Sequence, residues 1–173
     1  MASVAAGSCA TVAGILLGCK AANLDLKVVA FTVFPAKKDY FANTIKTLFE
    51  QTNLLLHNKD SSFGEFTYSD EDLYIDETMA GPGYGVFTPA GLEAAAKIAE
   101  EEVFLEGTYT AKVFAGLLTH LQQNPSQVAL FWNTYSGLDF SSFIQNQDYR
   151  NLPCCFHDYF NDANLQELDQ ASS

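Results

Sequence analysis

The chain has 173 residues, the size of one domain, and 48% of them are hydrophobic while 17% are charged, which fits a packed core rather than disorder. The formal net charge is -12 and the nine Lys and Arg residues form no basic stripe, which argues against nucleic acid and an anionic membrane as partners. The four cysteines lack metal-ligand spacing, so no metal site is expected. Idle thiols, the absence of a signal-peptide pattern and an apolar run too short to span a bilayer favour a cytoplasmic location.

The first half of the chain alternates between predicted strands and helices. Residues 2–6 are short and apolar, and apolar residues at helical spacing predict a helix over 11–22. The run 27–34 is β-branched and apolar on both faces, which predicts a strand buried on both sides. An amphipathic helix is expected over 38–56, and residues 73–76 form a candidate short strand.

The second half predicts two more helices and a final strand. A Thr-Pro start indicates a helix over 88–102, whose terminal glutamates oppose the helix dipole and predict a frayed end. Another helix begins at Thr108 or Thr110, and the apolar run 127–132 reads as a second buried strand.

This order of elements predicts an α/β fold with a parallel sheet covered by helices on both faces, a three-layer αβα arrangement. Ligands of such sheets sit at the carboxyl ends of the strands. That rule selects the segments 7–11, the residues from Pro35 onward, and 133–137.

The segment Gly7-Ser8-Cys9-Ala10-Thr11 joins a predicted strand to a predicted helix. A glycine permits a tight turn, two hydroxyls can donate, and the helix start offers unpaired N–H groups and the positive end of a dipole. Together they predict an anion cradle suited to a phosphate. Plain helix capping by small residues is the alternative interpretation.

Several segments in sequence resemble the family of D-cysteine desulfhydrases and aminocyclopropane-carboxylate (ACC) deaminases, which are pyridoxal-phosphate enzymes of the tryptophan synthase β-like group. Each match alone is weak, but together they keep the family's order and approximate spacing over roughly residues 2–143. The matching segments are Gly7–Thr11, Asp76–Thr78, Gly81–Val86, Thr88–Ala94, Gly107–Lys112, Ala115–Leu117 and Val128–Thr134.

The resemblance implies the C-terminal half of a tryptophan synthase β-like fold, truncated at its N-terminus. Residues 1–150 would form part of the large cofactor-binding domain, and residues 151–173 would form a C-terminal tail. The family's Schiff-base lysine lies in the N-terminal half and has no recognisable copy here. A missing N-terminal half or a homodimer partner is therefore the expected protein partner. Lys37, Lys38 and Lys112 are interpreted as solvated lysines rather than nucleophiles.

The resemblance also assigns the cofactor to named positions. The side chains of Ser8 and Thr11 and the backbone of residues 7–10 would hold the phosphate of pyridoxal phosphate. The hydroxyl of Thr134 would face the ring nitrogen of the cofactor. The family has two glycines where this loop has Cys9 and Ala10. The full set of implied cofactor-binding residues is Gly7, Ser8, Cys9, Ala10, Thr11, Thr110 and Thr134.

Two tyrosines, Tyr84 and Tyr109, are the implied catalytic residues, because a phenol beside the substrate can orient a carboxylate or move a proton. Without the flanking matches, a turn tyrosine packed on its neighbours and a plain aromatic at a helix start are the simpler interpretations.

The implied activity is a lyase or deaminase acting on a small amino acid. Threonine at positions 110 and 134, where the ACC deaminases tend to carry glutamate and leucine, favours D-cysteine desulfhydrase-like elimination to pyruvate, ammonia and sulfide over ACC deamination. The alternative is a catalytically inactive remnant or binding module without the Schiff-base lysine. An unrelated α/β binding domain is a third interpretation.

Overall fold

The computed structural model describes residues 1–37 and 39–161. Most predicted elements are present, with ends shifted by one to three residues. In chain order the main elements are β1 (Ala2–Ala6), α1 (Ala10–Ala21), β2 (Val28–Thr32), α2 (Tyr40–Lys59), β3 (Leu73–Asp76), α3 (Pro89–Ala99), α4 (Thr110–Gln123) and β4 (Leu130–Phe131).

The four strands form one parallel sheet in the order β3-β2-β1-β4. The two central strands are in register from Ala2 opposite Val28 to Ala6 opposite Thr32. All five residues of β2 are buried, as its unbroken apolar run predicted. The predicted α/β class and the parallel sheet are therefore confirmed.

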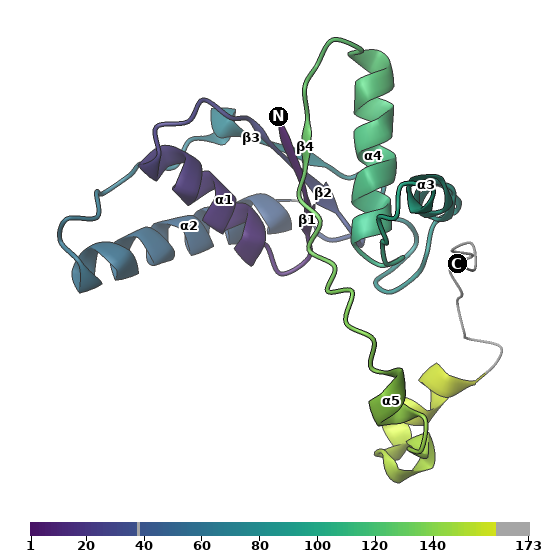
Figure 1. Cartoon of the computed structure of the whole chain (residues 1–173). Coiled ribbons are helices and arrows are strands. Elements are labelled where there is room, and N and C mark those ends of the chain that lie inside the picture. Colours follow the sequence, from purple (N-terminus) through teal and green to yellow (C-terminus); the bar gives the residue numbers. More distant parts are fainter. Residues whose placement is uncertain (38, 162–173) are drawn as a thin grey trace.

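Helices cover both faces of the sheet, with α1 and α2 on one side and α3 and α4 on the other (Figure 1). Alternate strand residues supply the two cores: Val4 and Ala30 pack with α1 and α2, whereas Phe31 packs against Val113 of α4. At Gly116 an added Cβ would lie 2.2 Å from Cε1 of Phe31. A glycine at this position therefore lets α4 approach the sheet closely.

The final strand corrects one prediction. The run 127–132 was expected to be a buried strand, but β4 is two residues long, lies at the sheet edge and pairs only with β1 among the described strands. Leu130 is 49% exposed. An apolar run signals that a segment can be buried, while burial itself needs a second neighbouring strand.

Beyond β4 the chain runs extended away from the sheet and continues into α5 (Ser141–Ile144) and two 3-10 helices, η2 (Tyr149–Asn151) and η3 (Cys154–Phe160) (Figure 1). The rings of Tyr149 and Phe160 stack with centroids 4.8 Å apart. The predicted domain boundary at residue 150 stays a prediction, and residues 162–173 of the predicted tail lie outside the described residues.

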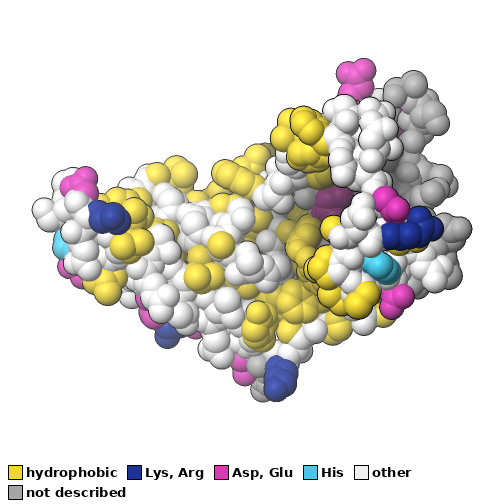
Figure 2. All heavy atoms as spheres, turned by 90° about the horizontal axis from the view of Figure 1, so that it is seen from below, with side chains coloured by type: hydrophobic (Ala, Val, Ile, Leu, Met, Phe, Trp, Pro, Cys, Tyr) yellow, Lys and Arg dark blue, Asp and Glu magenta, His cyan; other side chains and the backbone are white. Residues whose placement is uncertain are grey.

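Two expectations about the surface are addressed by the described residues. Lys and Arg side chains are few and scattered on the face shown in Figure 2, without a basic patch there. None of the described helices has the length and hydropathy needed to cross a lipid bilayer.

Candidate functional site

Because the strands are parallel, their carboxyl ends meet at one edge of the sheet. The segment after β1 leads through Gly7 into α1, the segment after β2 carries Phe34, and β3 ends at Asp76. The segments 7–11 and 35 onward, which the strand-end rule selected from the sequence, therefore follow neighbouring strands at this edge.

The N-terminus of α1 is open. Within the described residues no side chain caps it, and its first turn contains no acidic residue. Ser8 and Thr11 are exposed, so their hydroxyls lie on the accessible side of the turn. A helix start of this kind presents N–H groups and a positive partial charge to solvent, which suits an anion.

Cys9 has the left-handed backbone conformation, with φ 66°, that glycine adopts without steric cost. Its side chain is only 2% exposed and packs in the core beside Val12, while Sγ donates weakly to the carbonyl of Gly7 at 3.8 Å. Burial raises the pKa of this thiol to about 11. The side chain that replaces the family's glycine at this position is therefore directed into the core.

Tyr109 lies between the loop of residues 7–11 and the rest of the edge. An added Cβ at Gly7 would lie 2.8 Å from Cε1 of Tyr109, so the ring lies directly against the loop. The hydroxyls of Tyr84 and Tyr109 are hydrogen-bonded to each other, and their ring centroids are 6.0 Å apart. Phe34 packs edge-on against Tyr84 at 5.9 Å. The structure therefore brings both predicted tyrosines and the loop together.

The environment of Tyr109 favours its neutral form. Burial, the hydrogen bond and charge of Tyr84, and the charge of Glu106 together raise the pKa of Tyr109 to about 12. Tyr84 in contrast is 64% exposed. The pair therefore offers one sheltered and one accessible phenol at the same position.

Glu106 caps the N-terminus of α4 and was not predicted as a site residue. Its carboxylate accepts hydrogen bonds of 2.7 Å from the backbone N–H groups of Thr108, Tyr109 and Thr110. The hydroxyl of Thr110 also bonds to Glu106, and Thr110 is 1% exposed. The signal in the sequence was an acidic residue shortly before a predicted helix. Thr110 is therefore buried, and its hydroxyl is hydrogen-bonded to Glu106. Its predicted contact with a cofactor stays a prediction.

Thr134 lies in the extended segment that follows β4 and is exposed. The backbone N–H of Trp132 donates to the carbonyl of Ser3 at 2.9 Å, so the chain leaves β4 alongside β1 and toward the carboxyl edge. Thr134 and the loop at Ser8 thus follow two neighbouring strands at the same edge. This placement is the one on which the predicted cofactor site depends.

Lys112 corrects another prediction, since it was expected to be solvated. It is fully buried, and its Nζ donates to the carbonyls of Val33 at 2.8 Å and Ala80 at 2.9 Å. Burial lowers its pKa, an effect that the nearby carboxylate of Glu106 opposes. The charge type pointed to the surface, whereas the position in the first turn of α4, facing the sheet, decides the burial.

At the end of β3, Asp76 is hydrogen-bonded to His120 of α4. The Nε2 of His120 donates to Oδ2 of Asp76 at 2.7 Å, and Thr78 donates to Oδ1 through its backbone N–H at 2.8 Å and its hydroxyl. Burial pushes the pKa of Asp76 upward, but the hydrogen bonds from Thr78 and His120 outweigh it and lower the pKa. No group of metal-ligating side chains occurs in the described part of the chain.

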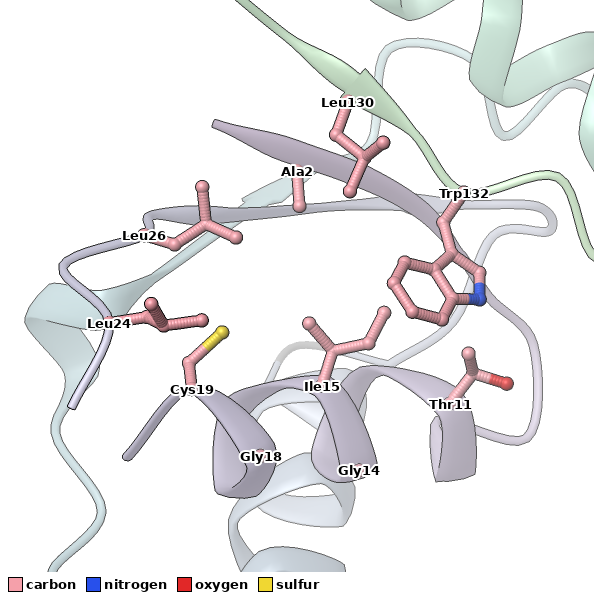
Figure 3. A pocket seen from close by; sticks show the side chains of 10 residues that line it. All are labelled: Ala2, Thr11, Gly14, Ile15, Gly18, Cys19, Leu24, Leu26, Leu130 and Trp132. Carbon is pink, nitrogen blue, oxygen red and sulfur yellow. The ribbon is translucent and has the colours of Figure 1, made fainter. Parts of the chain in front are cut away.

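An apolar groove of about 520 Å³ lies between α1 and the strand edge, and Thr11 at the start of α1 is one of the residues that line it. In Figure 3 the indole of Trp132 lies above Ile15 with Thr11 beside it, while Gly14 and Gly18 form the floor along α1. Thr11 therefore lies between the uncapped N-terminus of α1 and this apolar groove.

The fold belongs to a known class. A solved structure described as an ACC deaminase homologue matches with a TM-score of 0.62 and 23% sequence identity, over 82% of this chain and 42% of that chain. At this level of identity the match establishes the fold, an ACC deaminase-like α/β fold with a parallel sheet. No protein-family model matches the chain.

The sequence relatives narrow the class. D-cysteine desulfhydrase from Salmonella paratyphi B is 29% identical over 136 residues, which is 76% of this chain and 38% of that protein. The enzyme of the same name from Salmonella paratyphi C is 29% identical over 122 residues, or 69% of this chain and 34% of that protein. These matches confirm the predicted resemblance to the D-cysteine desulfhydrase and ACC deaminase family. The chain spans little more than a third of the length of these relatives.

Proposed function

We propose that this chain is part of a pyridoxal-phosphate-dependent lyase or deaminase that acts on a small amino acid. The observation that carries the proposal is the meeting of two features at one edge. The open N-terminus of α1 bears the hydroxyls of Ser8 and Thr11, and Gly7 of the same loop lies against the ring of Tyr109, which is bonded to Tyr84.

The residues of the loop fit the phosphate of the cofactor. The helix start lacks a side-chain cap, Ser8 and Thr11 are accessible, and the side chain of Cys9 is turned into the core. In this proposal the two hydroxyls and the N–H groups of residues 7–10 hold the phosphate, and Thr134 offers a hydroxyl to the ring nitrogen. When bound, pyridoxal phosphate supplies an electron sink for breaking bonds at the α-carbon of an amino acid.

The two phenols act on the substrate in this proposal. The exposed hydroxyl of Tyr84 binds and orients the substrate carboxylate, and its hydrogen bond to Tyr109 fixes its direction. Tyr109 stays protonated at neutral pH, since its pKa is raised to about 12, and therefore acts as a hydrogen-bond donor or a proton source rather than a base.

D-cysteine is the substrate we favour. The elimination converts D-cysteine and water into pyruvate, ammonia and sulfide. The printed names of the sequence relatives support this choice, and so does the threonine at positions 110 and 134. At position 110 the side chain is a hydroxyl that is hydrogen-bonded to Glu106. This position therefore supplies no carboxylate of the kind that the ACC deaminases tend to carry there.

A binding module without catalysis is the second candidate, and Lys112 favours it. This lysine at the site edge is fully buried and donates to two backbone carbonyls, so its amine is not available to bond the cofactor. In this second reading the lysine that bonds the cofactor comes from a longer chain or from a partner chain, as the family resemblance implies. The required partner would supply the part of the relatives that this chain does not match.

The test separates cofactor binding from turnover. Pyridoxal phosphate is titrated into the chain and followed by absorbance and by the phosphorus NMR signal, with Ser8→Ala/Thr11→Ala as the variant and Ser61→Ala, at an exposed turn, as the control. We expect saturable binding that the double variant weakens at least tenfold. Sulfide release from D-cysteine is then measured with the unmatched portion of the Salmonella enzyme added. If pyridoxal phosphate binds neither to the chain alone nor to the chain with the added portion of the Salmonella enzyme, the proposal is refuted. Binding without sulfide release would support the second candidate.

A further inference from the structure

Three segments converge on the side chain of Lys112. Its Nζ donates to the carbonyl of Val33, just after β2, and to the carbonyl of Ala80, in the loop between β3 and α3. Lys112 itself lies in the first turn of α4, one helical turn beyond Tyr109. A single ammonium group therefore joins the end of a strand, a glycine-rich loop and the start of a helix.

Each of these segments carries one ring of the aromatic group at the site. Phe34 follows Val33, Tyr84 follows Ala80 in the loop, and Tyr109 precedes α4. The rings of Phe34 and Tyr84 are 5.9 Å apart and those of Tyr84 and Tyr109 are 6.0 Å apart. The relative positions of the three rings thus depend on how the three backbones are held together.

The placement of this cation is unfavourable without that role. Its side chain is fully buried, and it lies at the positive end of the α4 dipole, where a cation is disfavoured. Two carbonyl acceptors and the charge of Glu106 offset this. A hydrophobic side chain would fill the space without the electrostatic cost, but it would leave both carbonyls without their donor.

The loop is shaped around the lysine. Gly81, next to Ala80, has φ +71°, and a Cβ there would lie 3.5 Å from Nζ of Lys112 and 2.7 Å from Cγ2 of Thr88. Only glycine adopts this backbone conformation without steric cost while allowing the loop to approach so closely. The glycine-rich sequence between β3 and α3 therefore serves the same contact.

We propose that Lys112 is a positioning residue that clamps the glycine-rich loop to β2 and α4 and thereby sets the hydrogen bond between Tyr84 and Tyr109. It touches neither phenol in this role and acts through the backbone of the two segments. Its importance for turnover rests on the proposed function, whereas the clamp itself is a property of this chain and is measured without cofactor or substrate.

The test uses tyrosine ionisation, which reports the pair directly. In protein with ¹³Cζ-labelled tyrosine, a Tyr109 with a pKa of about 12 is about one tenth ionised at pH 11, where an ordinary tyrosine is about nine tenths ionised. At pH 11 the side chain of Lys112, whose pKa is lowered by burial, is a neutral amine that keeps two N–H donors for the carbonyls of Val33 and Ala80. In Lys112→Met both donors are absent, the loop loosens and Tyr109 becomes solvated, so more than half of Tyr109 should ionise at pH 11. Lys97→Met, at an exposed lysine of α3, should leave the fraction unchanged. Signals are assigned with Tyr84→Phe and Tyr109→Phe.

A folded Lys112→Met protein whose Tyr109 titrates as in the unchanged chain would overturn the proposal. A second measurement on the unchanged chain covers the case in which the variant does not fold. In ¹⁵N-lysine-labelled protein, the ammonium protons of Lys112 should exchange slowly at pH 8 and show contacts to the protons of Gly81. If all lysine ammonium signals exchange as fast as those of exposed lysines, the clamp does not exist. Neither measurement depends on pyridoxal phosphate, so a chain that fails the test of the proposed function can still pass this one.

Discussion

Two helices begin at the same edge of the sheet, and their N-termini are completed in opposite ways. At α4 the carboxylate of Glu106 accepts hydrogen bonds from three successive backbone N–H groups. At α1 no side chain within the described residues caps the first turn, and the turn contains no acid. Both helix starts have backbone N–H groups without partners inside the helix, and both have the same positive partial charge. The difference therefore lies in what the sequence supplies to each.

This difference separates stability from binding. A closed end is satisfied internally and holds Tyr109 and Thr110 in place, while an open end keeps its donors for a ligand and gives up the stabilisation of a cap. Asp76, bonded to Thr78 and His120, extends the closed side of the edge to β3. The following substitutions break or sharpen this contrast between the two sides.

The largest effect is expected when the closed end is opened. Glu106→Ala removes the shared acceptor of three half-buried N–H groups and should lower the free energy of unfolding by about 2 to 3 kcal/mol. Urea denaturation measures the change. Glu101→Ala, at an exposed glutamate after α3, is the control and should change it by less than about 0.5 kcal/mol. Equal effects of the two substitutions would remove the distinction between the ends.

Gly7→Ala tests how closely the two sides touch. Its added Cβ would meet Cε1 of Tyr109 at 2.8 Å, so the ring or the loop must shift, at a cost of about 1 to 2 kcal/mol. Gly137→Ala, where nothing lies within 4 Å, is the matched control and should be close to neutral. Thermal unfolding of both variants gives the comparison. A neutral Gly7→Ala would mean that the loop and Tyr109 are not in contact.

Acid should weaken the closed side in a pH-dependent way. The folded state lowers the pKa of Asp76, so its contribution to stability is full above the ordinary pKa near 3.8 and is lost as the pH falls through the lowered value. The free energy of unfolding should therefore fall more steeply from pH 5 to pH 3 in the unchanged chain than in Asp76→Asn. Asp25→Asn, at an exposed aspartate, should keep the slope of the unchanged chain. Identical slopes in all three proteins would exclude this role of Asp76.

Closing the open end should produce the smallest change in stability and a clear loss of binding. Ser8→Asp places an acceptor and a negative charge at the start of α1 and should stabilise the chain by about 0.5 to 1 kcal/mol. The same charge repels phosphate, so inorganic phosphate should no longer shift the amide NMR signals of residues 7–11. Ser8→Ala, which adds no charge, should retain part of that shift. Unchanged phosphate binding in Ser8→Asp would show that the anion does not bind at this helix start.

Local signals in the sequence predicted most of the scaffold. The helices at α2 and α4, the Thr88 cap and the buried strand β2 all follow from periodicity and turn residues within one segment. The helix α3 ends at Ala99, just before the glutamates that were expected to weaken its end. The two tyrosines were implied by the family resemblance, and the structure places their hydroxyls within hydrogen-bonding contact of each other.

What the sequence did not reveal depends on contacts between distant segments. Lys112 can be buried because two carbonyls, 79 and 32 residues away in the sequence, accept hydrogen bonds from its Nζ. No local sequence pattern encodes those partners. The edge position of β4 depends on the strand order rather than on its own apolar residues. The direction of the Cys9 side chain follows from a left-handed backbone at that residue, which the letters Cys-Ala do not announce.

Trp132, described above at the rim of the apolar groove, is the only tryptophan in the chain. Its indole is 44% exposed, so its fluorescence emission depends on how much water reaches that groove. Any event that dries the groove shifts the emission to shorter wavelength, and denaturation shifts it the other way. The protein thus contains its own spectroscopic probe, which follows the strand next to the one that leads into residues 7–11 and is usable without a label.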